Sequence, residues 1–342
     1  PKHLESALVS RLKIMAHLDI AEKRLPQDGV ARVRVGEREI DIRVSTVPVT
    51  EGERVVLRLL SRSSTMLPLA GLGLPKNILT GLESVLNRPH GIFLVCGPTG
   101  SGKTTTLYAA LQRLDTDRLN ILTIEDPVEY HLPNIGQIQI KPKIGLTFAA
   151  GLRHILRQDP DVIFLGEIRD LESAEIAIRA SMTGHMVFAT LHTNDAAGAP
   201  IRLIDMGIAP YLLSSALRGV MAQRLVRRLC GVCKKEVSSS VPIPGISEEI
   251  RSKLAGSGMY LPVGCSGCLE GYKGRSGIFE FLTITREVQD YLRSSSATSN
   301  GLLEIAKGQG MQTLLEHGVE EVVKGVTSVQ ELMRAVGAID YA

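Results

Sequence analysis

Hydrophobic residues recur at two different periods in the first part of the chain. From residue 4 to 18 they follow helical spacing, which predicts a helix. Hydrophobic and polar residues alternate over residues 31–35, 39–44 and 54–60, which predicts three half-buried strands. We therefore expect a small α+β domain over residues 1–62.

The pattern then changes to short apolar runs separated by longer helical stretches. The expected strands lie at residues 91–97, 121–125, 162–166 and 186–191. Such alternation is typical of a mostly parallel sheet covered by helices, the α/β class. We expect this domain at residues 63–229. After Gly277 the hydrophobic spacing is helical, which predicts a helical domain over residues 276–342.

Charge and composition narrow the function classes. The 342 residues carry a net charge of +3 and no Trp, a balance that disfavours nucleic acid as a partner. Basic residues gather near one cysteine pair, and we interpret them as a solvated or protein-facing surface: Arg224, Arg227, Arg228, Lys234 and Lys235. No apolar run approaches the ~18 residues of a membrane span, and no signal peptide is seen, so a cytosolic location is expected.

A complete phosphate-binding loop lies between an expected strand and an expected helix. It matches G-x-x-x-x-G-K-[ST] and consists of Gly97, Pro98, Thr99, Gly100, Ser101, Gly102, Lys103 and Thr104. The glycines let backbone N–H groups converge on a phosphate at the start of the helix. Lys103 then neutralises phosphate oxygens, and the Thr104 hydroxyl ligates Mg²⁺. The chain is therefore expected to bind a nucleoside triphosphate.

Two acidic residues follow expected strands that would share an edge with this loop. Glu125 ends the run 121–125, and Glu167 follows the run 162–166. Carboxyl ends of parallel strands meet at one edge, so both carboxylates can converge on one nucleotide. Hydrolysis needs such acids to hold Mg²⁺ and orient water. The alternative is that they cap helices or lie on the surface as simple charges.

Histidines and arginines extend the candidate site. His192 follows the strand 186–191 and can hydrogen-bond a γ-phosphate. His185 precedes that strand, and for it a structural role is as well supported as a role at the site. Arg43 and Arg58 lie outside the nucleotide domain, where a guanidinium delivered across a domain or subunit boundary should originate. Solvated or salt-bridged arginines are the alternative.

Four of the five cysteines form two C-x-x-C pairs. Cys230 with Cys233 and Cys265 with Cys268 offer four thiolates, a set that suits a tetrahedral structural Zn²⁺. The gap between the pairs is longer than in compact zinc ribbons, and four reduced, metal-free thiols are the alternative. We expect a zinc-binding module at residues 230–275. The fifth, Cys96, is interpreted as a small buried hydrophobic residue.

Taken in order, these motifs resemble the secretion ATPase superfamily. The resemblance rests on the phosphate loop and the runs 123–129, 156–161, 166–170 and 183–193, which match it over nearly the whole chain. The tetracysteine insert and the run 271–280, which reads Gly-Tyr-Lys-Gly-Arg-Ser-Gly-Ile-Phe-Glu, look like the GspE branch, which drives type II secretion, and its sibling that extends type IV pili.

The resemblance implies a RecA-like ATPase domain that hydrolyses ATP in a hexameric ring, with residues 1–62 as part of a PAS-like domain. Glu125 would polarise the attacking water, Glu167 would hold Mg²⁺, and Arg43 and Arg58 would act as fingers from the preceding domain. The implied partners are further copies of the chain and cytoplasmic parts of inner-membrane secretion proteins, so the implied location is peripheral at the inner membrane.

Two departures from the family pattern remain. We expect the sequence to lack the family's N-terminal docking domain and the first strands of the second domain. Pro200 lies within a helical pattern and is expected to kink or shorten that helix.

The leading hypothesis is an ATP-driven motor that powers pseudopilus assembly and protein export. Its first alternative is a type IV pilus extension ATPase, and its other rivals are a RecA-like nucleic-acid translocase and a nucleotide-gated scaffold without turnover.

Overall fold

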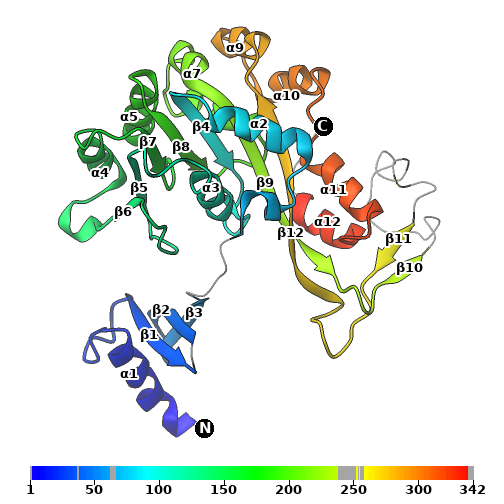
Figure 1. Ribbon diagram of the computed structural model, residues 1–342. Helices are drawn as coiled ribbons and strands as arrows, with labels where there is room; N and C mark the ends of the chain where they lie inside the picture. The colour runs from blue at the N-terminus through cyan, green and yellow to red at the C-terminus, as the bar shows by residue number, and fades with distance from the viewer. Residues whose placement is uncertain are drawn as a thin grey trace. The chain divides into compact units, whose positions relative to one another are not determined.

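The computed structural model describes residues 2–36, 38–61, 67–237, 252, 254 and 258–337. The chain forms two compact units, Pro1–Met66 and Leu67–Ala342 (Figure 1). Each unit is described by itself below. The finer division of the second unit at residues 229, 275 and 276 stays a prediction.

The N-terminal unit is a helix packed on a three-stranded antiparallel sheet. Its elements are η1 (Lys2–Leu4), α1 (Glu5–Met15), β1 (Gln27–Val35), β2 (Arg38–Val49) and β3 (Gly52–Ser61), with strand order β1-β2-β3. The predicted helix and three strands are confirmed, and the strands are longer than expected. A small core forms around Ala16, Ala31 and Val44.

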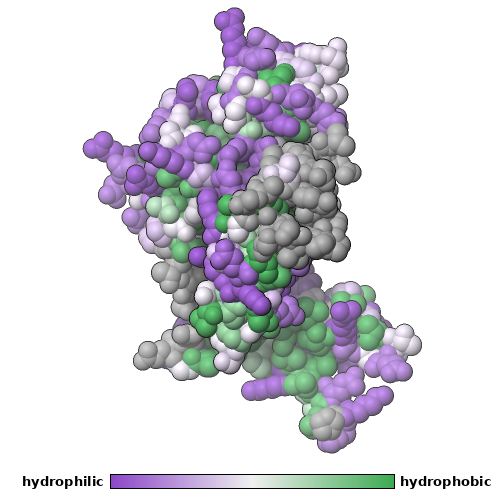
Figure 2. All heavy atoms as spheres, turned by 90° about the vertical axis from the view of Figure 1, so that its right-hand side faces the viewer, coloured by the Kyte–Doolittle hydropathy of each residue, from purple (hydrophilic) through white to green (hydrophobic). Residues whose placement is uncertain are grey.

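Much apolar surface of this unit stays exposed. Hydrophobic side chains gather on it at the bottom of Figure 2, and the exposed ones include Val30, Val35, Val56, Leu57 and Leu59. Inside the unit, Lys13 is almost fully buried and forms a 2.5 Å ion pair with Glu53. A buried pair of opposite charges is tolerated because each supplies the other's missing solvation.

The second unit is built on a seven-stranded sheet of order β12-β9-β4-β8-β7-β5-β6. Its strands are β4 (Gly91–Cys96), β5 (Ile121–Glu125), β6 (Gly136–Gln139), β7 (Val162–Leu165), β8 (Met186–Leu191), β9 (Leu217–Leu229) and β12 (Tyr272–Thr283). β12 runs antiparallel to β9, and the other neighbouring strands pair in parallel. The predicted mostly parallel α/β sheet is confirmed.

Helices cover this sheet on both sides of its buried central strands (Figure 1). They are η2 (Leu69–Leu72), α2 (Lys76–Leu86), α3 (Lys103–Leu111), η3 (Pro142–Ile144), α4 (Phe148–Ile155), α5 (Leu171–Met182), α6 (Gly198–Asp205), α7 (Pro210–Ala216), α9 (Arg286–Arg293), α10 (Ser299–Gly308), α11 (Leu314–Val323) and α12 (Val329–Val336). α11 packs on β12, and α12 packs on β9. β10 (Lys235–Val237) and β11 (Met259–Leu261) pair in antiparallel as a separate two-stranded sheet.

The expectation of helix directly after Gly277 was wrong, because β12 continues to Thr283. Its run Ile278 to Leu282, apolar except for Glu280, is almost entirely buried, and such a run does not distinguish a central strand from a buried helix. β6 and β9 were also missed. β9 is a strand in which apolar residues alternate irregularly with Gln and Arg, so it lacks a period of two.

The expected kink at Pro200 was wrong as well. α6 begins at Gly198 and continues to Asp205, so Pro200 lies in its first turn. The N–H groups of a first turn have no acceptor within the helix. Proline there loses no hydrogen bond and has a favourable backbone angle.

Candidate functional site

The phosphate loop joins the buried central strand β4 to α3. Gly97, Gly100 and Gly102 have φ values of 147°, 81° and 91°, which favour glycine. A Cβ on Gly97 would lie 2.5 Å from the Gln223 backbone oxygen, and one on Gly102 would lie 2.7 Å from Gln223 Nε2. The loop therefore needs glycine for both its backbone angles and its close contact with β9.

Lys103 and Ser101 present buried polar atoms inside this loop. Lys103 is 8% exposed, and its Nζ donates to the backbone oxygens of Gly97 at 2.7 Å and Pro98 at 3.1 Å. Burial lowers the pKa of Lys103, and the nearby Glu167 charge opposes that effect. Ser101 Oγ is buried with no hydrogen-bond partner among the described residues. The loop thus offers a cation and an unsatisfied hydroxyl, which fit an anionic ligand.

Glu167 and His192 are brought together at the edge beside this loop. His192 Nε2 lies 3.1 Å from Glu167 Oε2, and Arg169 forms an ion pair with the same carboxylate. Arg169 also reaches Asp126 at 3.4 Å. Burial would raise the pKa of Glu167, but the hydrogen bonds from Arg169 and His192 lower it overall. Glu167 is therefore a charged group poised for a cation.

Glu125 lies in a different environment, although it ends the neighbouring strand. It is 2% exposed, and its carboxyl accepts hydrogen bonds from Tyr108 Oη, from Thr123 Oγ1 at 2.5 Å and from Gln137 Nε2 at 3.3 Å. Burial raises the pKa of Glu125. The sequence did not indicate this buried network, because Tyr108 lies on α3 and Gln137 on β6. The role of Glu125 toward water stays a prediction.

His185 and Cys96 occupy structural positions. His185 precedes β8, and its Nδ1 lies 2.9 Å from the Ala180 backbone oxygen at the end of α5. Cys96 is fully buried, and its Sγ donates to the Asp195 backbone oxygen at 3.1 Å. Burial raises the pKa of Cys96 to about 12. Cys96 therefore packs as a neutral thiol.

Two residues of β9 belong to the site and were missed as such. Gln223 Oε1 accepts from Thr106 Oγ1 on α3 at 2.8 Å. Arg224 Nη2 donates to the Asn194 backbone oxygen at 2.8 Å, two residues after His192. Their signal in the sequence is weak, because the irregular pattern of β9 does not indicate which of its polar residues point inward.

The interpretation of the basic cluster as a solvated or protein-facing surface was wrong for Arg224, whereas Arg228 and Lys235 are exposed as expected. Arg224 is 5% exposed. Arg227 Nε lies 2.9 Å from Glu331 Oε2, and its guanidinium covers the Tyr272 ring at 4.1 Å. Lys234 Nζ donates to the Gly325 backbone oxygen at 2.8 Å. Arg227 and Lys234 are thus half-buried and have partners within the second unit.

Arg43 and Arg58 belong to the N-terminal unit, where β2 and β3 place them directly opposite each other. Arg58 is exposed and Arg43 is half-buried. Their action on a nucleotide stays a prediction.

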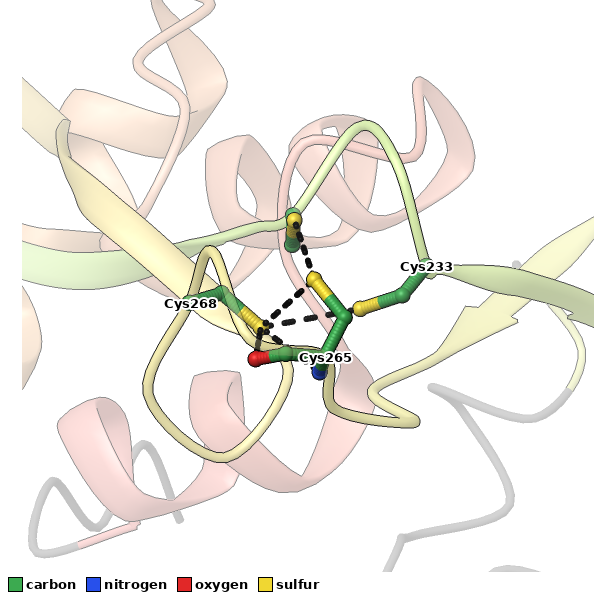
Figure 3. A group of neighbouring side chains, drawn as sticks. Cys233, Cys265 and Cys268 are labelled. Carbon is green, nitrogen blue, oxygen red and sulfur yellow. Dashed lines mark hydrogen bonds between the residues drawn. The ribbon is translucent and has the colours of Figure 1, made fainter.

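The four paired cysteines converge on one point. Cys233, Cys265 and Cys268 point toward one another in Figure 3. The Sγ distances are 4.0 Å for Cys230–Cys265, 3.7 Å for Cys233–Cys268 and 3.6 Å for Cys265–Cys268. A tetrahedron with Zn–S distances of about 2.3 Å separates sulfur atoms by about 3.8 Å. The cluster therefore has the dimensions of a tetrahedral four-thiolate metal site.

No helix within the described ranges is long and apolar enough to cross a membrane.

The family model described as type II/IV secretion system protein matches residues 1–334. HxcR, a type II secretion system protein of Pseudomonas aeruginosa, is 53% identical over 97% of this chain and 67% of its own length. The type II secretion system ATPase E of Vibrio cholerae is 48% identical over 97% of this chain and 66% of its own length.

Solved structures show the same fold. A crystal structure of the pilus retraction motor PilT with bound ADP is 29% identical, with a TM-score of 0.64 over 91% of this chain and 77% of that one. The Legionella pneumophila ATPase DotB, at 22% identity, has a TM-score of 0.67 over the same shares and supports the fold alone. Since the family model and relatives about half identical span nearly all of it, the chain belongs to the type II/IV secretion system protein family.

Proposed function

We propose that this chain is the ATP-hydrolysing motor of a type II secretion system, which powers pseudopilus assembly and protein export. The observation that carries the proposal is the phosphate loop with Lys103 buried in it and the Glu167–His192 pair at the adjoining sheet edge. A relative 48% identical is named an ATPase, and PilT is a motor with bound ADP. The chain spans about two thirds of the length of the type II secretion relatives, 66% for the Vibrio protein.

Each site residue has a distinct proposed role in hydrolysis. Lys103 would exchange its two loop carbonyls for phosphate oxygens, and Ser101 Oγ would gain a partner there. Thr104 and Glu167 would hold Mg²⁺, which neutralises phosphate charge when bound. His192 would contact the γ-phosphate, since its imidazole already lies at the Glu167 carboxylate. Glu125 would accept the proton of the attacking water, a task that suits a carboxyl whose pKa is raised.

The cysteine cluster is proposed to hold a structural Zn²⁺. Its four thiols fill a tetrahedral set, which leaves no open position for catalysis. Cys230 and Cys233 follow β9, whereas Cys265 and Cys268 precede β12. A zinc ion there would tie the ends of two paired strands together. This favours a structural role.

Assembly and location extend the proposal. We place the chain in a homo-oligomeric, hexameric ring at the cytoplasmic face of the inner membrane, where it meets secretion-platform proteins. Arg43 and Arg58 would supply positive charge to a nucleotide from their separate unit. The two arginines and the phosphate loop lie in different units of the chain.

Type IV pilus extension is the second candidate for the same motor. Relatives about half identical to the chain are named type II secretion system proteins, which favours secretion. A nucleic-acid translocase is disfavoured, because Arg224, Arg227 and Lys234 have partners within the chain. A nucleotide-gated scaffold would bind ATP without releasing phosphate.

The test compares phosphate release and ATP binding in three variants. We expect Lys103→Ala to weaken binding of Mg-ATP at least about 100-fold, since it removes the loop's cation. Glu167→Gln should keep most of the binding and slow phosphate release about 100-fold or more. The control Lys307→Ala, at an exposed position of α10, should change neither.

Calorimetry measures binding, and a phosphate assay measures turnover. Unchanged ATP affinity in Lys103→Ala would contradict the loop assignment. Binding without any phosphate release by the unaltered protein would favour the scaffold instead. Stimulation by single-stranded DNA that disappears with added salt would favour the translocase.

A further inference from the structure

Glu280 is a fully buried carboxyl that contacts two separate parts of the second unit. It lies on β12 and is 0% exposed. One oxygen, Oε1, accepts from the backbone N–H of Ala196 at 2.8 Å, and the other, Oε2, accepts from the backbone N–H of Leu314 at 3.1 Å. Ala196 comes four residues after His192, and Leu314 is the first residue of α11. One side chain therefore joins the segment after the candidate site histidine to a C-terminal helix.

The segment Asn194–Ala196 is held from three neighbouring strands. Cys96 on β4 donates to the Asp195 oxygen, Arg224 on β9 donates to the Asn194 oxygen, and Glu280 on β12 accepts from Ala196. Cys96 immediately precedes Gly97 of the phosphate loop. If Asn194–Ala196 shifts when a nucleotide binds, the shift is opposed by these three side chains or transmitted to them.

The other end of the contact is the start of a helix. The first N–H groups of α11 lack partners within the helix, and its N-terminus carries the positive end of the helix dipole. Thr313 and Glu316 already form a capping box there. Glu280 adds a partner that comes from the sheet. The N-terminus of α11 thus receives one hydrogen bond from Glu280, which also binds Ala196 beside the phosphate loop.

We propose that Glu280 is a positioning residue that couples nucleotide occupancy at the phosphate loop to the stability of α11. The coupling rests on the proposed nucleotide function of the loop. A nucleotide that contacts His192 orders the segment Asn194–Ala196. The Ala196 N–H then holds the Glu280 carboxylate in place, and that carboxylate holds the Leu314 N–H at the start of α11. The C-terminal helices thereby respond to the nucleotide without touching it.

The chemistry of the contact gives a sharp variant. A carboxylate accepts through both oxygens, whereas the amide of Gln has one accepting oxygen and a donating NH₂ group. Glu280→Gln therefore keeps its size but can satisfy only one of the two N–H groups, and its NH₂ meets the other donor. Glu280→Asp retains both acceptors on a shorter side chain.

A second buried carboxyl supplies the matched control. Glu331 on α12 has a side chain that is 0% exposed, and it accepts from the Arg227 backbone N–H at 2.9 Å and from Arg334. These partners, Arg227 and Arg334, lie on β9 and α12 rather than in residues 194–196. Glu331→Gln removes an equally buried charge without altering the proposed route.

The experiment is hydrogen exchange of residues 313–323 in the 342-residue chain, with and without a Mg²⁺-bound non-hydrolysable ATP analogue. In the unaltered chain and in Glu331→Gln, we expect the analogue to slow exchange there about fivefold or more. In Glu280→Gln that effect should fall below about twofold, while analogue affinity measured by calorimetry stays within about threefold. Glu280→Asp should retain part of the effect.

Each outcome decides between the two proposals. Bound analogue with unchanged exchange at 313–323 in the unaltered chain overturns the coupling and leaves the nucleotide site standing, even if Glu280→Gln does not fold. A full exchange effect in folded Glu280→Gln overturns it too. Absence of analogue binding in the unaltered chain overturns both proposals.

Discussion

At the scale of single residues, buried glutamates of the second unit differ in function because their partners differ. Glu125 is surrounded by a hydroxyl, a phenol and an amide, which stabilise it without supplying positive charge. Burial therefore dominates, and its pKa rises. Burial would also raise the pKa of Glu331, but hydrogen bonds from Arg334 and Arg227 lower it overall. The pKa of the same residue type is thus shifted in opposite directions within one domain.

This contrast predicts how stability depends on pH. Because the folded-state pKa of Glu125 is raised, its contribution to stability is full below the unfolded pKa and declines as pH rises through the folded pKa. Gln resembles the protonated carboxyl, so Glu125→Gln should gain stability relative to the unaltered chain from pH 5 to pH 8. The measurement is the difference in urea unfolding midpoints at the two pH values.

Glu331→Gln is the control for that measurement. The lowered pKa of Glu331 gives stability that is present above the unfolded pKa, near 4.3, and lost only at more acidic pH. Its difference from the unaltered chain should therefore stay constant between pH 5 and pH 8. A constant difference for Glu125→Gln as well would show that Glu125 is ionised in the folded protein throughout this range.

At the scale of elements, the ends of strands carry the chemistry. β4, β7 and β8 end at the phosphate loop, Glu167 and His192, and their parallel order places these ends at one edge. One cysteine pair instead follows the C-terminal end of β9, and the other precedes the N-terminal end of β12. Antiparallel pairing of β12 with β9 brings Tyr272 opposite Leu229, so both pairs meet although 31 residues separate them in the sequence.

The cysteine cluster gives an element-scale prediction. We expect about one zinc ion per purified chain, and Cys265→Ser should lose most of it because a hydroxyl is a far poorer zinc ligand than a thiolate. Thermal unfolding should begin at a lower temperature in that variant. Elemental analysis measures the metal content.

Cys96→Ser serves as the matched control, since Cys96 is a free cysteine remote from the cluster in sequence and bonded to Asp195. It should retain the zinc. If the unaltered chain, purified without chelator, contains no zinc, or if Cys265→Ser keeps it all, the structural metal proposal is wrong.

At the scale of the whole molecule, the chain consists of two units with separate cores. The phosphate loop lies in one, whereas the opposed Arg43 and Arg58 lie in the other. A charged group contributed by a separate unit acts only when the units, or neighbouring subunits, come together. If Arg43 and Arg58 act on the nucleotide as proposed, turnover depends on assembly.

This division predicts that phosphate release per chain rises with protein concentration. Arg43→Ala and Arg58→Ala should each slow release about 100-fold or more at saturating ATP, while binding at the phosphate loop stays nearly unchanged. Arg54→Ala, which removes an exposed arginine from the same strand as Arg58, is the control and should change little. Release independent of concentration, or equal loss in all three variants, would contradict a shared site.

Local sequence was sufficient for much of the fold. The helix 4–18, the three strands of the first unit and four strands of the second were predictable, because each has a clear period or a short apolar run with turn residues beside it. β6, β9 and β12 were not predicted, because β6 is a short, half-exposed edge strand and β9 and β12 lack a clear period of two. Pro200 shows the same limit, because its effect depends on where the helix begins.

The candidate site divides in the same way. The glycines, Lys103 and Thr104 are determined by sequence, because a phosphate loop is a local structure whose backbone angles and spacing are written in eight adjacent residues. The pairing of cysteines was visible in the sequence, but only strand pairing between β9 and β12 brought their sulfur atoms together.

The sequence by itself determined that a nucleotide-type loop, acidic strand ends and two cysteine pairs exist. Only the tertiary structure decided that Glu167 joins His192 while Glu125 is enclosed by Tyr108 and Gln137. It alone placed Glu280 between Ala196 and α11. The physical reason is that a side chain's charge, partners and access to solvent depend on residues far away in the sequence, which no local pattern encodes.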